Sequence, residues 1–375
     1  MATSRQGTVF TTTPLSSVSF EHARETIVSA FNLCKDADER LCAQGADSSD
    51  SPLCRRLVGV RILGHLLRHA PSDTAVSHIA KSIVSTKRRD APDAGDLADL
   101  GMFYEQHLIR RFRRFKGRTP QPSSHSSRVS LDFNEKIIQS TLVEAPLSHS
   151  TAKNLVFARD EYRCMLSGKV HEPYWTEVYS LKHQDAEHPS YTFAECAHVF
   201  PESMNTRFQE KDELKHATNA WTVMRYLGFP SIVDELKGDK IHSLENMLTL
   251  EPFLHAFFDR LCLWLEPDLA IPNCYHVGSV KPLESIGIMK SVVTFKSHVQ
   301  DPPLPLPKAD YLRIHASCCK VAHLSGASKL YDQLERELDS DPDSGTPEFA
   351  SALLARLELI QHYGFVEGSP EDNPP

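Results

Sequence analysis

The chain contains 375 residues, of which 41% are hydrophobic, and it carries a formal net charge of −8. A hydrophobic content of this size is ordinary for a globular protein with a core. The negative charge argues against a protein that coats nucleic acid through bulk positive charge, although a local basic patch is compatible with a negative net charge. The nine cysteines follow no regular spacing, unlike a disulfide framework, and they favour a reducing, intracellular compartment, with the nucleus and the cytoplasm both open.

The N-terminal part of the chain is predicted to be helical. Residues 1–19 lack the apolar core of a signal peptide and are expected to form a flexible start. In the helical region, residues 20–118, apolar side chains recur at helical spacing over 21–42 and 54–69, and a third helix is expected over 97–115. No run reaches the roughly 18–20 consecutive apolar residues of a membrane span, so we expect no membrane partner.

Beyond residue 118 the composition predicts a linker, a second domain and a tail, which are 119–130, 131–338 and 339–375. The linker is rich in serine and proline and has no apolar periodicity. The second domain contains a polyproline-like connector at 302–307 and ends in predicted helices over 311–324 and 327–338. The tail is acidic and rich in proline, and it shows one short helical pattern over 348–363.

Three segments of the second domain combine charged, aromatic and turn-forming residues in an order that suggests a site. Residues 159–168 form a charged turn that leads into a short strand. Residues 195–201 have a strand pattern that stops at a proline. Residues 244–259 predict a loop with an asparagine, a short strand and a helix with Pro252 near its first turn.

The residue types in these segments suit the hydrolysis of a phosphodiester bond. This reaction requires a base for the attacking water, a cation for the developing charge and a fixed geometry between them. His198 is the candidate base, because a histidine has an unperturbed pKa of roughly 6.5, near the working pH. His255 and Asp259 stand at i and i+4 of one helix, so their side chains share a face and can bind one divalent ion. Asn246 is expected to hold the base and the metal ligands in register through hydrogen bonds to the backbone.

Together these segments resemble the HNH endonuclease family, in particular a branch common in fungal proteins of unassigned role. The resemblance covers about residues 155–330. It rests on four motifs in a fixed order, which are Arg-Asp-x-Tyr-Arg-Cys-x-x-Ser-Gly at 159–168, Cys-Ala-His-x-x-Pro at 196–201, Asn246 before an apolar strand, and His255-x-x-x-Asp259. The downstream run 312–327 also resembles those fungal proteins. Each motif alone is a weak signal, whereas their order and spacing make the set fairly specific.

The resemblance implies an α+β fold in which a β-hairpin and a helix, the ββα-metal module, grip one metal ion. Further helices and the N-terminal helical region would elaborate this module. It implies that His198 is the general base, that Asn246 is structural and that His255 binds the metal, beside Asp259. The implied activity is that of a metal-dependent endonuclease that cleaves nucleic acid, DNA more often than RNA. The expected ion is Mg²⁺, with Mn²⁺ and Zn²⁺ as alternatives.

Two features depart from the family pattern and leave a second interpretation open. Many members carry Asp or His directly before the base, whereas this chain has Ala197. Strand alternation places Glu195 on the same face as Ala197, so Glu195 is a candidate additional ligand. The segment 199–245 is far longer than a hairpin turn needs and is expected to pack as a helix over the site. The alternative is therefore a degenerate HNH scaffold that binds nucleic acid or a protein partner without cutting.

Other residues near the motifs have plainer interpretations. Arg110, Arg111, Arg113 and Arg114 lie in a segment with an apolar stripe, which favours an amphipathic helix with a solvated basic face over a face that contacts phosphates. The chain has no Cys-x-x-Cys pair, so Cys164 and Cys196 are expected to be buried thiols rather than zinc ligands.

Overall fold

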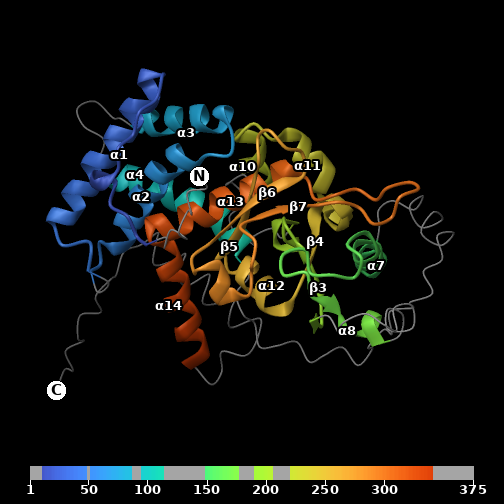
Figure 1. Ribbon diagram of the computed structural model, residues 1–375. Coiled ribbons are helices and arrows are strands. Elements are labelled where there is room, and N and C mark those ends of the chain that lie inside the picture. The colour runs from blue at the N-terminus through green and yellow to red at the C-terminus, as the bar shows by residue number, and fades with distance from the viewer. Residues whose placement is uncertain are drawn as a thin grey trace, which may run out of the picture. The chain divides into compact units, whose positions relative to one another are not determined.

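The computed structural model describes residues 11–48, 51–86, 94–113, 148–176, 190–205 and 220–340. The described residues up to Ser328 form one compact unit, and the chain from Lys329 onward belongs to a second. In the described part, helices and small two- and three-stranded sheets make up the first unit, so the fold class is α+β, as predicted (Figure 1). None of the described helices has the length and apolar character that crossing a membrane requires. The predicted linker, most of the predicted tail and its short helix lie outside the described residues.

The N-terminal helices follow the apolar spacing of the sequence. They are α1 (Glu25–Ala43), α2 (Cys54–His69), α3 (Asp73–Ser85), α4 (Ala94–Tyr104), the π-helical turn η2 (Glu105–Ile109) and α5 (Arg110–Phe112). The predicted helices over 21–42 and 54–69 are confirmed with small shifts at their ends. Sequence reasoning missed α3, although Ser72 caps it by accepting a hydrogen bond from the backbone N–H of Ala75.

Helix α2 lies at the centre of this region. All of its residues from Leu57 to Leu67 are buried. It packs against α4 through two glycines, and a Cβ atom added to Gly101 would lie 1.8 Å from the carbonyl oxygen of Gly59. No other residue type allows such an approach of two helix backbones. Because neither glycine has a side chain, the backbones of the two helices are in direct contact at this point.

The start of the chain, predicted to be flexible over 1–19, is described from residue 11 and is packed there. Leu15 is fully buried, and its backbone N–H donates to Asp38 of α1 at 2.8 Å. The backbone N–H of Thr13 donates to the carbonyl of Leu324 at 2.9 Å. Buried apolar surface and paired backbone groups hold this segment in place, which its polar composition did not predict.

The central part of the fold is a β-hairpin followed by a helix. Strand β3 (Glu195–His198) pairs antiparallel with β4 (Met247–Leu250), and α12 (Pro252–Asp259) follows directly (Figure 1). Upstream of the hairpin lie α7 (His149–Arg159), β1 (Val170–His171), α8 (Glu172–Tyr174) and β2 (Tyr191–Thr192), and β1 pairs parallel with β2. The arrangement agrees with the predicted ββα order.

The segment between the two hairpin strands is helical where it is described, as predicted. It contains η4 (Glu202–Asn205), α10 (Ala220–Tyr226), α11 (Pro230–Leu236), η5 (Gly238–His242) and η6 (Leu244–Asn246). Trp221 is buried and stacks on Phe200, the second residue after β3, with 6.2 Å between ring centroids. The hydroxyl group of Tyr226 donates to the carbonyl of His78 in α3, so the insertion also joins the hairpin region to the N-terminal helices.

A second sheet and a long helix complete the first unit. Strands β5 (Leu263–Pro267), β6 (Cys274–Ser279) and β7 (Val292–Thr294) form an antiparallel sheet that sequence reasoning missed. Helix α13 (Ala309–Ser325) packs against both β5 and α2, and α14 (Ala327–Ser340) follows it after Gly326. The predicted helices over 311–324 and 327–338 are confirmed.

Candidate metal and base site on the β-hairpin

The register of the hairpin decides which predicted site residues can meet. His198 pairs with Met247 and Glu195 pairs with Leu250, so these two residues lie at opposite ends of the ladder. Neighbouring strand residues alternate between the two faces of a hairpin. Glu195 and Ala197 therefore share the face toward α12, and His198 lies on the other face.

Asn246 lies inside the protein, where its side chain joins the two strands' ends by hydrogen bonds. It is fully buried, and its Oδ1 accepts a hydrogen bond from the backbone N–H of Phe200 at 2.8 Å. Its Nδ2 donates to the carbonyls of Phe200 and Ile241, each at 2.9 Å. The backbone N–H of Val199 donates to the carbonyl of Asn246. The amide thus fixes the two residues that follow His198.

The charged lead-in before the hairpin forms a buried ion pair behind β4. Arg159 and Asp160 are buried and make two hydrogen bonds to each other, at 2.7 and 2.9 Å. The Arg159 guanidinium also donates to the carbonyls of Leu244 and Met247, both at 2.8 Å, and Asp160 accepts from the hydroxyl group of Thr249 at 2.7 Å. The sequence identified this segment as a motif but did not predict that Arg159 would bind backbone carbonyls of β4 and of η6 before it, because these groups are distant in the sequence.

Glu195, His255 and Asp259 form one group on the α12 side of the hairpin, called here the α12 group. The distance from His255 Nδ1 to Glu195 Oε2 is 2.7 Å, and from His255 Nε2 to Asp259 Oδ2 it is 3.4 Å. The hydrogen bond from His255 lowers the pKa of Glu195 below its usual value. The i and i+4 spacing therefore places the predicted pair on one helix face, and Glu195 reaches it from β3.

His255 and Asp259 of the α12 group offer one nitrogen and one oxygen donor that a divalent ion can share. His255 Nε2 is buried and has no hydrogen-bond partner among the described residues. A buried imidazole nitrogen that makes no hydrogen bond is costly, and a metal ion beside it would remove that cost. Metal-bound histidines commonly donate their second ring N–H to a carboxylate, as Nδ1 does here toward Glu195. The residues present therefore suit a metal ion at Nε2 of His255 and the carboxylate of Asp259.

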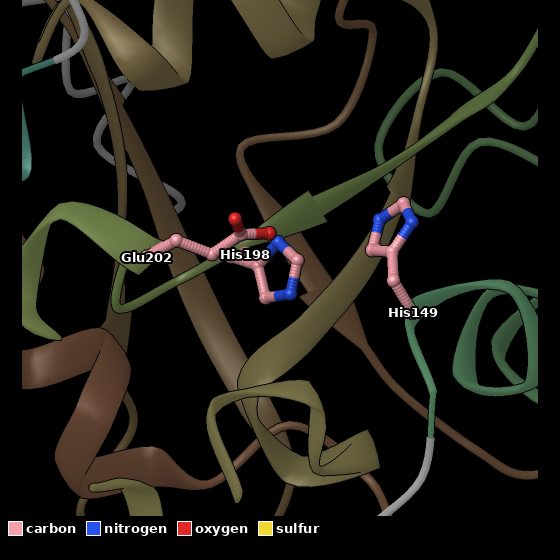
Figure 2. A group of neighbouring side chains, drawn as sticks. All are labelled: His149, His198 and Glu202. Atoms are coloured by element: carbon pink, nitrogen blue, oxygen red, sulfur yellow. The ribbon is translucent and has the colours of Figure 1, made fainter. Parts of the chain in front are cut away.

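His198 belongs to a second group, called here the histidine cluster, that contains His149, His198, Glu202 and His242. His198 is 3% exposed, and its Nε2 lies 3.1 Å from Nδ1 of His242. Ligand atoms of His149, His198 and Glu202 all lie within 4.8 Å of one another (Figure 2). Sequence reasoning missed three of these residues because they come from α7, η4 and η5, whose meeting no local pattern reveals.

The basic segment at the end of the N-terminal helices does not form a solvated face, in contrast to the prediction. Arg111 and Arg113 are 8% and 4% exposed, and they donate to the backbone carbonyls of Ser203 and Arg260. Arg110 pairs with Glu105 at 2.7 Å. Arg111 and Arg113 therefore connect the N-terminal helices to the hairpin region and are no exposed contacts for phosphates. Arg114 lies outside the described residues.

The cysteines have the features of structural thiols. All nine are free. Cys164 is 1% exposed, and burial raises the pKa of the Cys196 thiol to about 12. A thiol with such a pKa stays protonated at neutral pH. The predicted interpretation as buried thiols is confirmed for Cys164.

Comparison with known proteins identifies the central segment. Residues 164–264 match a family model described as HNH endonuclease. This segment contains β3, β4 and α12, together with His198, Asn246, His255 and Asp259. No curated protein and no solved structure matches the chain. The motif order, the ββα geometry and the family match together show that the chain carries a domain of the HNH endonuclease family.

Proposed function

We propose that this protein is a metal-dependent endonuclease that hydrolyses phosphodiester bonds, with DNA favoured over RNA as substrate. His255 and Asp259 hold a divalent ion, with Mg²⁺ favoured over Mn²⁺ and Zn²⁺, and Glu195 orients His255. His198 is the general base, and Asn246 positions the backbone that follows it. The free thiols support a reducing, intracellular compartment.

The buried Nε2 atom of His255 is the observation that carries the proposal. It is held 3.4 Å from the Asp259 carboxylate by a helix, while Glu195 fixes the other side of the ring from β3. A histidine that only fills a core would not need carboxylates at both of its nitrogens. The ion, when bound, supplies positive charge that stabilises the phosphate and the leaving oxygen in the transition state.

A hydrogen bond joins His198 Nε2 and His242 Nδ1, which lie 3.1 Å apart, and its direction sets which nitrogen of His198 takes the proton. When His198 Nε2–H donates to His242 Nδ1, the lone pair lies on Nδ1 of His198. Nδ1 then accepts a proton from water, and the imidazolium keeps its hydrogen bond to His242. The buried position of His198 limits the motion of the ring and so fixes the direction in which Nδ1 points.

A non-cleaving HNH module that binds nucleic acid is the second candidate. Ala197, the residue directly before His198, is fully buried and offers no ligand atom where many family members have one. The α12 group and His198 also lie on opposite faces of β3. A module that has lost its catalytic geometry would keep the buried Arg159–Asp160 pair and the Asn246 bonds, because these stabilise the fold.

Cleavage assays on the full chain distinguish the two candidates. Supercoiled plasmid, single-stranded DNA and RNA are each incubated with Mg²⁺ or Mn²⁺, and a chelator serves as the blank. The variants are His198→Ala for the base and Asp259→Asn for the metal, with His276→Ala as the matched control, since His276 is an exposed histidine on β6. Circular dichroism establishes that each variant is folded.

We expect the wild type and the control to cut DNA with metal, and removal of the base to lower the rate by about 10²–10⁴-fold. Asp259→Asn is expected to raise the metal concentration needed for half-maximal cleavage. A His198→Ala variant that cuts at the wild-type rate would refute the base assignment. Binding of DNA without cutting under either metal would establish the second candidate.

A further inference from the structure

The histidine cluster is a separate concentration of metal-binding side chains, outside the α12 group. His149 is the first residue of α7, His198 the last of β3, Glu202 the first of η4 and His242 the last of η5. The rings of His149 and His198 are stacked with 5.6 Å between centroids, and those of His149 and His242 lie 5.5 Å apart. Figure 2 shows His149, His198 and Glu202 projecting from three different elements into one space.

We infer that His149, His198 and Glu202 form a binding site for a transition-metal ion of the zinc class. Two imidazoles and one carboxylate suit zinc or cobalt, whereas magnesium prefers a shell of oxygen ligands. His198 coordinates through Nδ1 in the tautomer whose Nε2–H donates to His242 Nδ1, 3.1 Å away, and this hydrogen bond holds the ring. Three protein ligands leave a position open for water.

The observed spacing is compatible with this site after a small closure. Zinc bonds of about 2.0–2.1 Å to nitrogen place neighbouring ligands of a tetrahedral centre about 3.4 Å apart. The three ligand atoms lie within 4.8 Å of one another in the structure. His149 and Glu202 are exposed, so their side chains turn without repacking a core, while the buried His198 is the fixed ligand.

The site is distinct from the α12 group in both position and donors. Glu195 and Ala197 face α12, whereas His198 faces the histidine cluster, because strand residues alternate. His149 lies outside the segment that matches the HNH family model. Zinc bound here occupies the lone pair of His198 Nδ1 that takes the proton from water, so zinc inhibits cleavage. This consequence rests on the proposed function, whereas the binding itself does not.

The test measures binding first. The full chain in an Asp259→Asn background, which weakens the α12 group, is titrated with Co²⁺ followed by visible spectroscopy and with Zn²⁺ followed by calorimetry. His149→Ala and Glu202→Gln are compared with His276→Ala and Glu284→Gln, two exposed residues on β6 and η7 (Leu283–Ile286).

We expect the background protein to bind one equivalent of metal with nitrogen and oxygen ligands. The His149→Ala and Glu202→Gln changes should each weaken binding by at least about 10–100-fold, since even residues behind a metal ligand have effects of that size. The two control changes should leave the affinity unchanged. The proposal would be overturned if both cluster variants kept the zinc affinity of the background protein. It would also be overturned if the background protein, with Asp259→Asn alone, bound no metal, or if Co²⁺ gave an intense thiolate band.

A cleavage assay then tests the consequence. Added Zn²⁺ should inhibit Mg²⁺-dependent cleavage by the wild type, while His149→Ala and Glu202→Gln should keep cleaving and lose the inhibition. Equal inhibition of wild type and both variants would refute the link between this site and the base. If the protein does not cleave at all, the proposed function fails, and the metal titration still decides the site.

Discussion

Replacing Asn246 by alanine should destabilise the protein far more than replacing another asparagine that makes as many hydrogen bonds. Asn246 is fully buried and bonds to Phe200 N–H and to the carbonyls of Phe200 and Ile241. Alanine leaves these three backbone groups buried without partners, and each such group costs about 1–3 kcal/mol. Because the losses at one site overlap, we expect the free energy of unfolding to fall by about 3–5 kcal/mol.

Asn205 is the matched control for this change. Its side chain bonds to the backbone N–H and carbonyl of Gly238 and to the indole N–H of Trp221, at 3.0 Å each. Asn205 is exposed, so water replaces most of these bonds in the alanine variant, and the expected cost is below about 1 kcal/mol. Urea unfolding followed by circular dichroism gives both values. Equal losses in the two variants would refute the claim that burial makes the Asn246 bonds decisive.

Three further predictions follow from buried and paired charges. Replacing Asp160 by alanine leaves the Arg159 guanidinium as an uncompensated buried charge, which should cost about 3–5 kcal/mol in urea unfolding; a neutral effect would contradict the structural role of the pair. Replacing Glu195 by glutamine should weaken Mn²⁺ binding by about 10–100-fold in calorimetry, and unchanged affinity would show that Glu195 does not orient the metal ligand. Burial lowers the pKa of His65 to about 4 and of His315 to about 3, so only the unfolded chain takes up their protons as the pH falls below about 6.5. Stability should therefore decrease by about 2 kcal/mol for each histidine between pH 7 and pH 5, and a flat pH dependence of the unfolding free energy would contradict their burial as neutral groups.

The sequence predicted the elements whose signals are local. Apolar spacing marks α1 because one face of this helix is buried, and the i and i+4 spacing places His255 and Asp259 on one face of α12. The order of motifs from Arg159 to Asp259 predicted the HNH domain, which the family match confirms. Alternation along β3 also predicted that Glu195 lies on the Ala197 face, from which it contacts His255.

Tertiary structure alone decided the surroundings of these residues. His149, Glu202 and His242 meet His198 only because three separate elements converge, and no periodicity connects them. The sequence around Arg111 and Arg113 is typical of a solvated basic face. Both side chains are nevertheless buried, because the backbone carbonyls of Ser203 and Arg260 accept their hydrogen bonds. Local sequence determines which face a side chain occupies within its own element, whereas the partner across that face is determined by how distant elements pack.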